Sequence, residues 1–309
     1  MIERLEIERA AELIRGRLHR TPLFSCRALG PDAFLKAELF QKTGSFKPRG
    51  MLNKVASLSE QEKARGIVTW SAGNAAQGAA FAAAEAGIAC TVFMWATANP
   101  LNVEATRGYG AEVDLSSESP AEAHDRLLAH VEETGRIFVH PFDDPVLQAG
   151  HGTLGLEIVE DVPAVATIVV PVGGGGLIAG VASAVDCRVV GVEPEGAPSL
   201  SAALEAGVPV RIEPSSIADG LNAPFTGAGT LAVCRERVDE VVLVSDEEIA
   251  DGLRFLYARA KLACEPAGAA AVAALLAGKV AVDPGRPVVA VVSGGNADPR
   301  IAAGILASP

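Results

Sequence analysis

Residues 42 to 50 are Lys42-Thr43-Gly44-Ser45-Phe46-Lys47-Pro48-Arg49-Gly50, and this stretch decides how the rest of the chain is interpreted. Gly44 and Ser45 predict a turn and a helix start, and Pro48 stands in the first helical turn, where no N–H is needed. Phe46 places an apolar ring beside Lys47. Burial and the positive end of a helix dipole both favour a neutral amine, and a neutral lysine is a nucleophile that forms Schiff bases. Most lysines are solvated surface charges, so this interpretation depends on the other motifs of the chain.

Three later stretches place glycine, asparagine and serine directly after short apolar runs. In chain order they are Ser71-Ala72-Gly73-Asn74-Ala75-Ala76-Gln77-Gly78, Pro171-Val172-Gly173-Gly174-Gly175-Gly176-Leu177 and Ser293-Gly294-Gly295-Asn296. A strand that ends in a polar glycine turn before a helix presents N–H groups to an anion. The alternative for the first of these stretches is an ordinary capped helix. Four successive glycines suit a compact monophosphate, because the backbone can close around it with no side chain in the way.

Apolar strands alternate with helices over most of the chain. The expected strands are residues 34–40, 66–70, 89–94, 111–115, 136–139, 167–172, 188–192 and 287–292. The expected helices are residues 2–18, 46–58, 75–86, 101–108, 120–134, 146–159 and 177–185, and two more open near residues 245 and 266. This alternation predicts parallel sheets with helices on both faces. The segment Pro141-Phe142-Asp143-Asp144-Pro145 interrupts the pattern and is the expected return from a second domain to the first.

Together, the Lys47 stretch and the three later ones resemble the motifs of the fold-type II pyridoxal phosphate enzymes. The resemblance is to the threonine dehydratase and serine racemase branch of the tryptophan synthase beta-like superfamily, and it runs from about residue 20 to residue 300. It implies two open parallel-sheet α/β domains with the active site in the cleft between them. The large, cofactor-binding domain is expected at residues 1–62 and 147–309, and the small, substrate-binding domain at residues 63–146.

The resemblance also implies a role for individual residues. Pyridoxal phosphate is expected on the amine of Lys47, with Asn74 bonded to the ring hydroxyl and Ser293 to the pyridine nitrogen. The residues expected to bind the cofactor are Lys47, Phe46, Asn74, Gly173, Gly174, Gly175, Gly176, Leu177 and Ser293. The residues expected to bind the substrate are Ser71, Ala72, Gly73, Asn74 and Ala75. Glu265 is either a helix-terminal carboxylate without chemistry or, as the resemblance suggests, a neighbour of the cofactor ring.

The expected activity is a dehydratase that converts threonine or serine to a 2-oxo acid and ammonia by β-elimination. A hydroxyl on the pyridine nitrogen makes the ring a weaker electron sink than an aspartate would, which favours elimination over transamination. The substrate amine is expected to displace Lys47, which then takes the α-proton as general base. The alternatives are a 3-hydroxyaspartate dehydratase, a serine racemase, and a regulatory scaffold that binds pyridoxal phosphate without catalysis.

Two positions depart from the family pattern. Racemases of this branch carry an acid/base serine where Ala72 stands, and alanine cannot carry a proton. The position after Asn74 is usually histidine and is Ala75 here. Racemisation is therefore not expected as the main activity, and the preferred hydroxy amino acid stays open.

A divalent metal is bound in some relatives by a glutamate, a backbone carbonyl and an aspartate that follow the next strand. Glu193 and Ala197 match the first two positions, but Ser199 replaces the aspartate. A hard cation needs several oxygen ligands, so Glu193 and Ala197 are only weak metal candidates and no metal is expected.

The glycine run has a rival interpretation. Gly174, Gly176 and Ala179 satisfy the dinucleotide fingerprint, and Glu193 ends the next strand where a ribose-binding carboxylate would stand. An NAD site would leave the Lys47 and Asn74 stretches without a function, so pyridoxal phosphate is preferred.

Composition narrows the class of partner. The chain has 309 residues, 49% of them hydrophobic, a formal net charge of −12 and no basic run, which argues against nucleic acids and anionic membranes. Residues 162–185 carry no charged side chain, but Pro171 and four glycines predict a strand, a turn and a helix instead of a membrane span. Five scattered cysteines and a charged N-terminus predict a cytoplasmic protein. The family implies a homodimer with a small amino acid as substrate.

Overall fold

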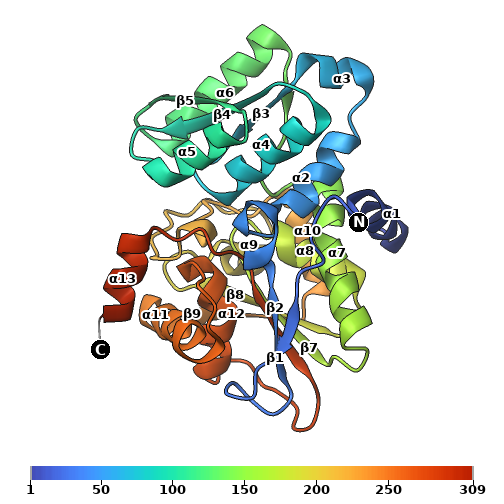
Figure 1. The fold of residues 1–309 in the computed structure, drawn as a ribbon, viewed down its shortest axis with the longest axis vertical. Helices are drawn as coiled ribbons and strands as arrows, with labels where there is room; N and C mark the ends of the chain where they lie inside the picture. Colours follow the sequence, from blue (N-terminus) through green and yellow to red (C-terminus); the bar gives the residue numbers. More distant parts are fainter. Residues whose placement is uncertain (1, 308–309) are drawn as a thin grey trace.

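The computed structural model describes residues 2 to 307 as two bodies, each built on one β-sheet (Figure 1). The larger sheet has six strands in the order β1-β2-β10-β7-β8-β9. Their bounds are β1 Leu23–Ser25, β2 Ala33–Ala37, β7 Thr167–Pro171, β8 Arg188–Pro194, β9 Glu240–Val244 and β10 Val288–Val292. Neighbouring strands are parallel except at one edge, where β1 pairs antiparallel with β2.

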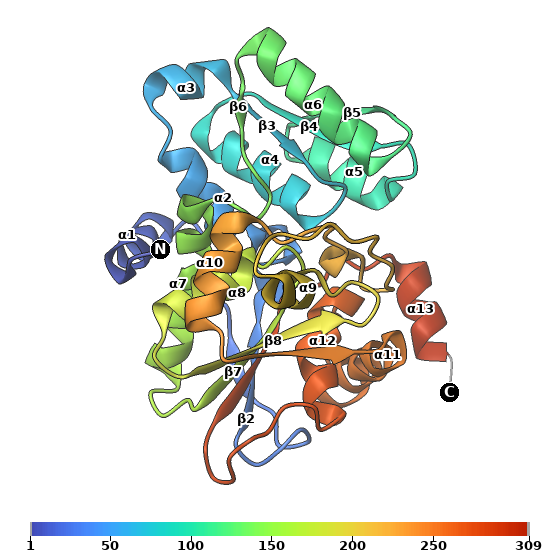
Figure 2. The same cartoon turned by 180° about the vertical axis from the view of Figure 1, so that it is seen from behind.

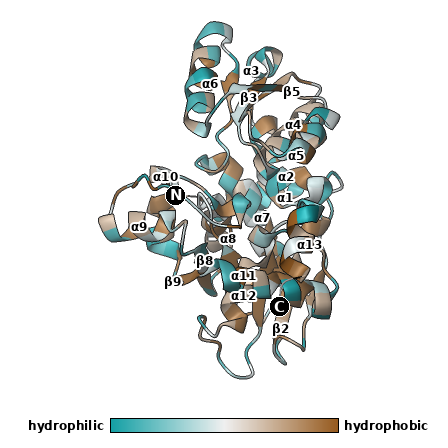
Figure 3. Ribbon diagram, turned by 90° about the vertical axis from the view of Figure 1, so that its left-hand side faces the viewer, coloured by the Kyte–Doolittle hydropathy of each residue, from teal (hydrophilic) through white to brown (hydrophobic). Residues whose placement is uncertain are grey.

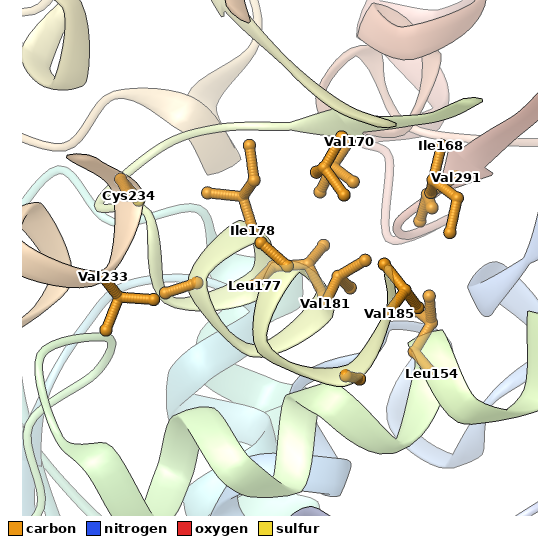
Figure 4. Close-up of a cluster of buried hydrophobic side chains, with 14 of the residues drawn as sticks. Leu154, Ile168, Val170, Leu177, Ile178, Val181, Val185, Val233, Cys234 and Val291 are labelled. Carbon is orange, nitrogen blue, oxygen red and sulfur yellow. The ribbon is translucent and has the colours of Figure 1, made fainter. Parts of the chain in front are cut away.

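Helices cover both faces of the larger sheet (Figures 1 and 2). They are α1 Arg4–Ile14, α7 Pro145–Asp161, α8 Gly176–Ala184, α9 Ser199–Ala206, α10 Ala228–Arg237, α11 Asp246–Phe255, α12 Pro266–Leu276 and α13 Pro299–Ala307. Alternate residues of β7 enter different cores. Ile168 and Val170 pack with residues of α7 and α8, as Figure 4 shows, whereas Val169 packs with residues of α11 and α12. This burial on both faces explains why the strand is a continuous apolar run.

The smaller sheet has four parallel strands in the order β5-β4-β3-β6. They are β3 Ile67–Trp70, β4 Cys90–Trp95, β5 Glu112–Ser117 and β6 Ile137–Phe138. The helices of this body are α3 Glu60–Arg65, α4 Asn74–Ala86, α5 Pro100–Gly108 and α6 Pro120–Thr134. Hydrophilic residues are prominent on α6, where only Ala123 and Leu127 are buried, whereas α12 is hydrophobic almost throughout (Figure 3). Helix α2, Lys47–Ala56, lies where the two bodies meet and packs against both α4 and α7.

The predicted fold class and its alternation of strands and helices are confirmed, with differences in short elements. The sequence analysis did not predict β1, β9, α3, α9 or α10, which have at most ten residues each. The strand expected to reach Phe40 ends at Ala37 and continues as a 3-10 turn, Glu38–Phe40. Residues 162–185 form β7, the glycine turn and α8 as predicted. Among the described residues, no helix is both long and apolar enough to cross a bilayer.

The helix start expected at Ser45 is wrong in detail. Phe46 occupies the N-cap position of α2, with αR dihedral angles and no capping side chain. The hydroxyl of Ser45 is buried and has no hydrogen-bond partner among residues 2–307. Pro48 stands in the first turn of the helix, as expected.

The position of α2 depends on a buried ionic cluster around Arg49, whose side chain has no exposure to solvent. Its guanidinium binds Glu38 through two bonds of 2.8 and 2.9 Å and Glu157 of α7 through two more of 2.7 and 2.8 Å. Lys36 of β2 also reaches Glu157, at 2.5 Å. Because planar bidentate pairs leave little rotational freedom, this cluster fixes α2 against β2 and α7.

We expect Arg49→Met to lower the free energy of unfolding by about 3–5 kcal/mol, because it leaves two buried carboxylates without their cation. Chemical denaturation followed by circular dichroism measures the change. The matched control is Arg15→Met in the Arg15–Glu12 pair, whose side chains are 73% and 71% exposed. Its effect should stay within about 0.5 kcal/mol. Equal stability of the two variants would show that the Arg49 cluster does not fix α2.

Candidate active site

The sequence motifs meet at the carboxyl ends of the parallel strands. Ser71 follows β3, Gly173 closely follows β7, and Ser293 directly follows β10. Ligands of open α/β sheets bind at this edge, because the strands end there and helix N-termini face the same space.

Lys47 is the first residue of α2 and is partly buried between the two bodies. Its Nζ donates a hydrogen bond of 3.1 Å to the carbonyl of Pro141 and lies 5.0 Å from the centroid of the Phe46 ring. Burial lowers the pKa of Lys47 to about 8, although the carboxylate of Glu265 acts in the opposite direction. The amine is therefore closer to its nucleophilic form at neutral pH than a surface lysine is.

The Lys47 stretch is joined directly to the Ser293 stretch. The amide of Phe46 donates to the carbonyl of Ser293 at 3.1 Å, and the amide of Gly295 donates to the carbonyl of Gly44 at 2.9 Å. Ser293 is buried, and no hydrogen bond from its hydroxyl is found among the described residues. The hydroxyl thus remains available to a ligand beside Lys47.

Asn74 connects the two bodies through its side-chain amide. Its Oδ1 accepts a 2.7 Å hydrogen bond from Asn296, and its Nδ2 donates one of 2.7 Å to Glu265. Asn296 also donates to the carbonyl of Thr43 at 2.7 Å. The amide of Asn74 therefore has one defined orientation, with its second N–H free for a ligand.

Glu265 belongs to this network, and its pKa is raised to about 7. Burial is the main cause; the hydrogen bond from Asn74 lowers the pKa, nearby Asp219 raises it, and Lys47 lowers it. Glu265 therefore lies among the predicted site residues and is more than a helix-terminal carboxylate. The sequence left these two interpretations open because the position of Asn74 opposite Glu265 depends on how the two bodies pack.

The glycine run forms a cradle of bare backbone at the start of α8. An added Cβ at Gly174 would overlap the ring of Phe142, and one at Gly176 would lie 2.7 Å from the carbonyl oxygen of Phe142. Gly175 has φ +82°, a left-handed conformation that glycine adopts without strain. Within residues 2–307, the amides of Gly173 to Leu177 donate no hydrogen bond. These free N–H groups at a helix N-terminus fit the phosphate of pyridoxal phosphate.

The Ser71 to Ala75 turn lies between β3 and α4. The hydroxyl oxygen of Ser71 accepts the amide of Gly73 at 3.2 Å, and the carbonyl of Ala72 accepts the side chain of Asn102 at 3.0 Å. In the described part of the chain, the amides of Asn74 and Ala75 donate no hydrogen bond. The turn therefore offers two amides to an anion, whereas the amide of Gly73 is already used.

The weak metal candidates lie in a different environment. Glu193 is fully buried, and its carboxylate accepts the amides of Leu200 at 2.6 Å and Ser201 at 2.9 Å, at the start of α9. Among residues 2–307, no cluster of three histidine, cysteine, aspartate or glutamate side chains is arranged to hold a metal. Because Glu193 is bonded to α9, it does not face the glycine cradle, and the dinucleotide interpretation loses its ribose-binding carboxylate.

Two parts of the site were not predicted. The segment Pro141 to Pro145 was expected only as a return between domains, yet it contacts Lys47 through Pro141 and the glycine cradle through Phe142. The ionic cluster behind Lys47 was missed as well. A signal was present in the charged residues Lys36 and Glu38 within an otherwise apolar predicted strand, because buried charges require partners.

We expect Glu265→Gln to change the pH dependence of stability in the protein without added ligand. A carboxyl with a raised pKa binds a proton in the folded protein that it releases when unfolded, so wild-type stability falls as pH rises from about 4.5 to about 7. The loss relative to Glu265→Gln is about 1.4 kcal/mol per pH unit and about 3 kcal/mol in total. Urea unfolding at several pH values measures it. Glu60→Gln, at a side chain 90% exposed, should follow the wild type, and identical curves for all three proteins would contradict the raised pKa.

Comparison with known proteins agrees with this geometry. The family model described as pyridoxal-phosphate dependent enzyme matches residues 14–294. An L-threonine ammonia-lyase of Thermotoga maritima is 45% identical over 308 residues, which cover 96% of this chain and 76% of the relative. The catabolic L-threonine dehydratase of Escherichia coli K12 is 41% identical, with 95% and 92% covered.

Solved structures show the same relationship. A maize serine racemase matches with a TM-score of 0.92 and 34% identity over 97% of this chain and 95% of its own. A threonine deaminase from T.th. matches with a TM-score of 0.89 and 38% identity over 96% and 99%. This chain belongs to the family of pyridoxal-phosphate dependent enzymes.

Proposed function

We propose that the protein is a threonine ammonia-lyase, also active on serine, which eliminates the β-hydroxyl and releases a 2-oxo acid and ammonia. The observation that carries the proposal is the position of the Lys47 amine, whose lowered pKa and hydrogen-bonded neighbours suit covalent attachment of pyridoxal phosphate. The relatives named as threonine ammonia-lyase and threonine dehydratase support the reaction. The coarser statement, a pyridoxal-phosphate enzyme of the carbon–oxygen lyase class, follows from the family and these relatives.

In this proposal Lys47 has two roles. Bound pyridoxal phosphate withdraws electrons from the bonds of the substrate α-carbon. Lys47 holds the cofactor until the substrate amine displaces it, and its free amine then accepts the α-proton. A pKa of about 8 suits both roles, because the amine is a nucleophile when neutral and holds the proton once it has accepted it.

The other residues orient the reacting groups. The free amides of Gly173 to Leu177 hold the phosphate, and the second N–H of Asn74 meets the ring hydroxyl. The hydroxyl of Ser293 meets the pyridine nitrogen, where a neutral partner favours elimination. The amides of Asn74 and Ala75 hold the substrate carboxylate.

Ala72 decides between elimination and racemisation in this scheme. Racemisation needs a proton donor on the substrate face opposite Lys47, and a methyl group cannot supply one. Elimination needs the α-proton to leave to Lys47 and the β-hydroxyl to leave as water. The resulting enamine then adds water and loses ammonia, which gives 2-oxobutyrate from threonine and pyruvate from serine.

We also propose the domain division of residues 1–62 and 147–309 for cofactor binding and residues 63–146 for substrate binding. The two sheets and the junction at α2 support it. A homodimer is proposed on the family resemblance. The cytoplasmic location is proposed on the five free cysteines of the structure, which suit a reducing compartment.

Lys47→Ala tests the proposed function directly. Wild-type protein with pyridoxal phosphate should show a near-visible absorbance band that borohydride removes, and it should release 2-oxobutyrate from threonine. The variant should lack the band and lose activity by roughly 10³-fold or more, because both the attachment point and the base are removed. Lys63→Ala on α3 is the control and should behave as the wild type.

The outcomes separate the alternatives. Wild-type activity in Lys47→Ala, or colourless wild-type protein, would overturn the proposal. Faster turnover of 3-hydroxyaspartate than of threonine, or D-serine as the main product from L-serine, would reassign the substrate or the reaction. A coloured protein inactive on every one of these amino acids would indicate a binding scaffold.

Gly174→Ala tests the phosphate cradle. Its new methyl group would overlap Phe142, and overpacking costs about 1–3 kcal/mol, so we expect affinity for pyridoxal phosphate to fall about tenfold or more. Absorbance titration measures the dissociation constant. Gly108→Ala is the matched control, because an added Cβ there meets nothing within 4 Å. Unchanged affinity in Gly174→Ala would place the phosphate elsewhere.

A further inference from the structure

His140 organises the turn that connects β6 to α7. Its Nδ1 accepts the amide of Asp143 at 2.9 Å and that of Phe142 at 3.3 Å. A ring nitrogen that accepts these bonds carries no proton, so the proton of the neutral imidazole is on Nε2. Burial lowers the pKa of His140 to about 4, with Asp143 acting in the opposite direction, and the ring is therefore neutral near pH 7.

The turn reaches the lysine on one side. The carbonyl of Pro141, directly after His140, accepts the amine of Lys47 at 3.1 Å. Among residues 2–307, this is the hydrogen bond that the structure shows for the amine. The turn also carries the ring of Phe142, which packs at 4.5 Å and 90° on His140 and fills the space beside Gly174.

The far end of the turn is anchored as well. Oδ1 of Asp143 accepts the amide and the hydroxyl of Thr230, at 2.9 and 2.8 Å. The carbonyl of Phe142 accepts the side chain of Gln148 at 3.0 Å. The carbonyl of Pro141 therefore lies between His140, which fixes the start of the turn, and contacts that fix its end.

We propose that His140 is a positioning residue for Lys47. Its Nδ1 holds the turn in the shape in which the carbonyl of Pro141 receives the lysine amine whenever that amine is not bound to the cofactor. The inference rests on the proposed function, in which the substrate displaces Lys47 and the displaced amine must stay within reach of the α-proton.

The physical reason is the mobility of lysine. A free side chain of this type has about 2 kcal/mol of rotamer entropy, and a base that moves by about 1 Å can lose about 10²-fold in rate. An N–H bond to a carbonyl orients the amine without using its lone pair, which stays available for the proton. The carbonyl accepts no proton itself, so the role of His140 is to supply a hydrogen-bond acceptor.

The chain contains a second turn that shows which residue can replace His140. Oδ1 of Asp144 accepts the amides of Val146 and Leu147, at 2.9 and 3.0 Å. These amides are two and three residues further on, the same spacing as Phe142 and Asp143 from His140. Asparagine at position 140 can therefore supply the acceptor, whereas leucine has nearly the same shape and supplies none.

The experiment compares His140→Asn with His140→Leu in the protein loaded with pyridoxal phosphate. We expect the Asn variant to keep kcat for threonine within about threefold of the wild type, and the Leu variant to lose about 10- to 100-fold with a smaller change in KM. Stopped-flow absorbance gives a second readout. The lysine-bound band should return after substrate exhaustion at the wild-type rate in the Asn variant and at least about tenfold more slowly in the Leu variant.

The wild type separates this inference from the proposed function. A wild type without a borohydride-sensitive band means that the proposed function has failed. If the wild type has the band, equal impairment of both variants overturns the role of the acceptor, and wild-type behaviour of the Leu variant does so too. If the Leu variant melts far below the wild type, the Asn variant still decides, because a tenfold loss there contradicts the inference and wild-type kcat supports it.

Discussion

The four hydrogen bonds between the buried guanidinium of Arg49 and the carboxylates of Glu38 and Glu157 hold the rest of the site in place. They fix α2 against β2 and α7, and Lys47 begins that helix two residues before Arg49. A buried cation is tolerated only with full compensation, so the geometry of this cluster is narrowly defined. The orientation of the lysine inherits that definition. The aromatic side of the same helix start is supported by His151, whose buried and neutral ring packs edge-on at 4.8 Å against Phe46.

Close backbone approach is the second constraint. Gly78 of α4 comes so near α2 that an added Cβ would lie 3.0 Å from the Cβ of Lys47. Gly44 and Gly294 are similarly enclosed by Asn296 and Glu265. Without side chains at these positions, turns from the two bodies can meet around one amine. The small residues of the motifs therefore have a packing role as well as a role toward a ligand.

The electrostatics follow from this packing. Lys47 and Glu265 lie in the same partly dry space, and burial moves both pKa values toward neutrality, to about 8 and about 7. Each group also favours the charged form of the other, which limits the shifts. A lysine near its neutral form, beside free amides that can hold anions, suits the covalent chemistry of the family.

The sequence alone determined the alternation of strands and helices, because apolar runs and glycine turns are local signals, and it identified the stretches around Lys47, Asn74, Gly174 and Ser293. It could not decide which of these meet, since that depends on strand order and on how the two bodies pack. Only the tertiary structure placed Asn74 opposite Glu265, Pro141 against Lys47 and Phe142 over the glycine cradle. It also turned Glu193 into a cap for α9, because the serine that follows the turn brings helix amides to the carboxylate. Contacts between residues far apart in the chain leave no periodic trace in the sequence, and for that reason the partners of these residues were decided by the fold.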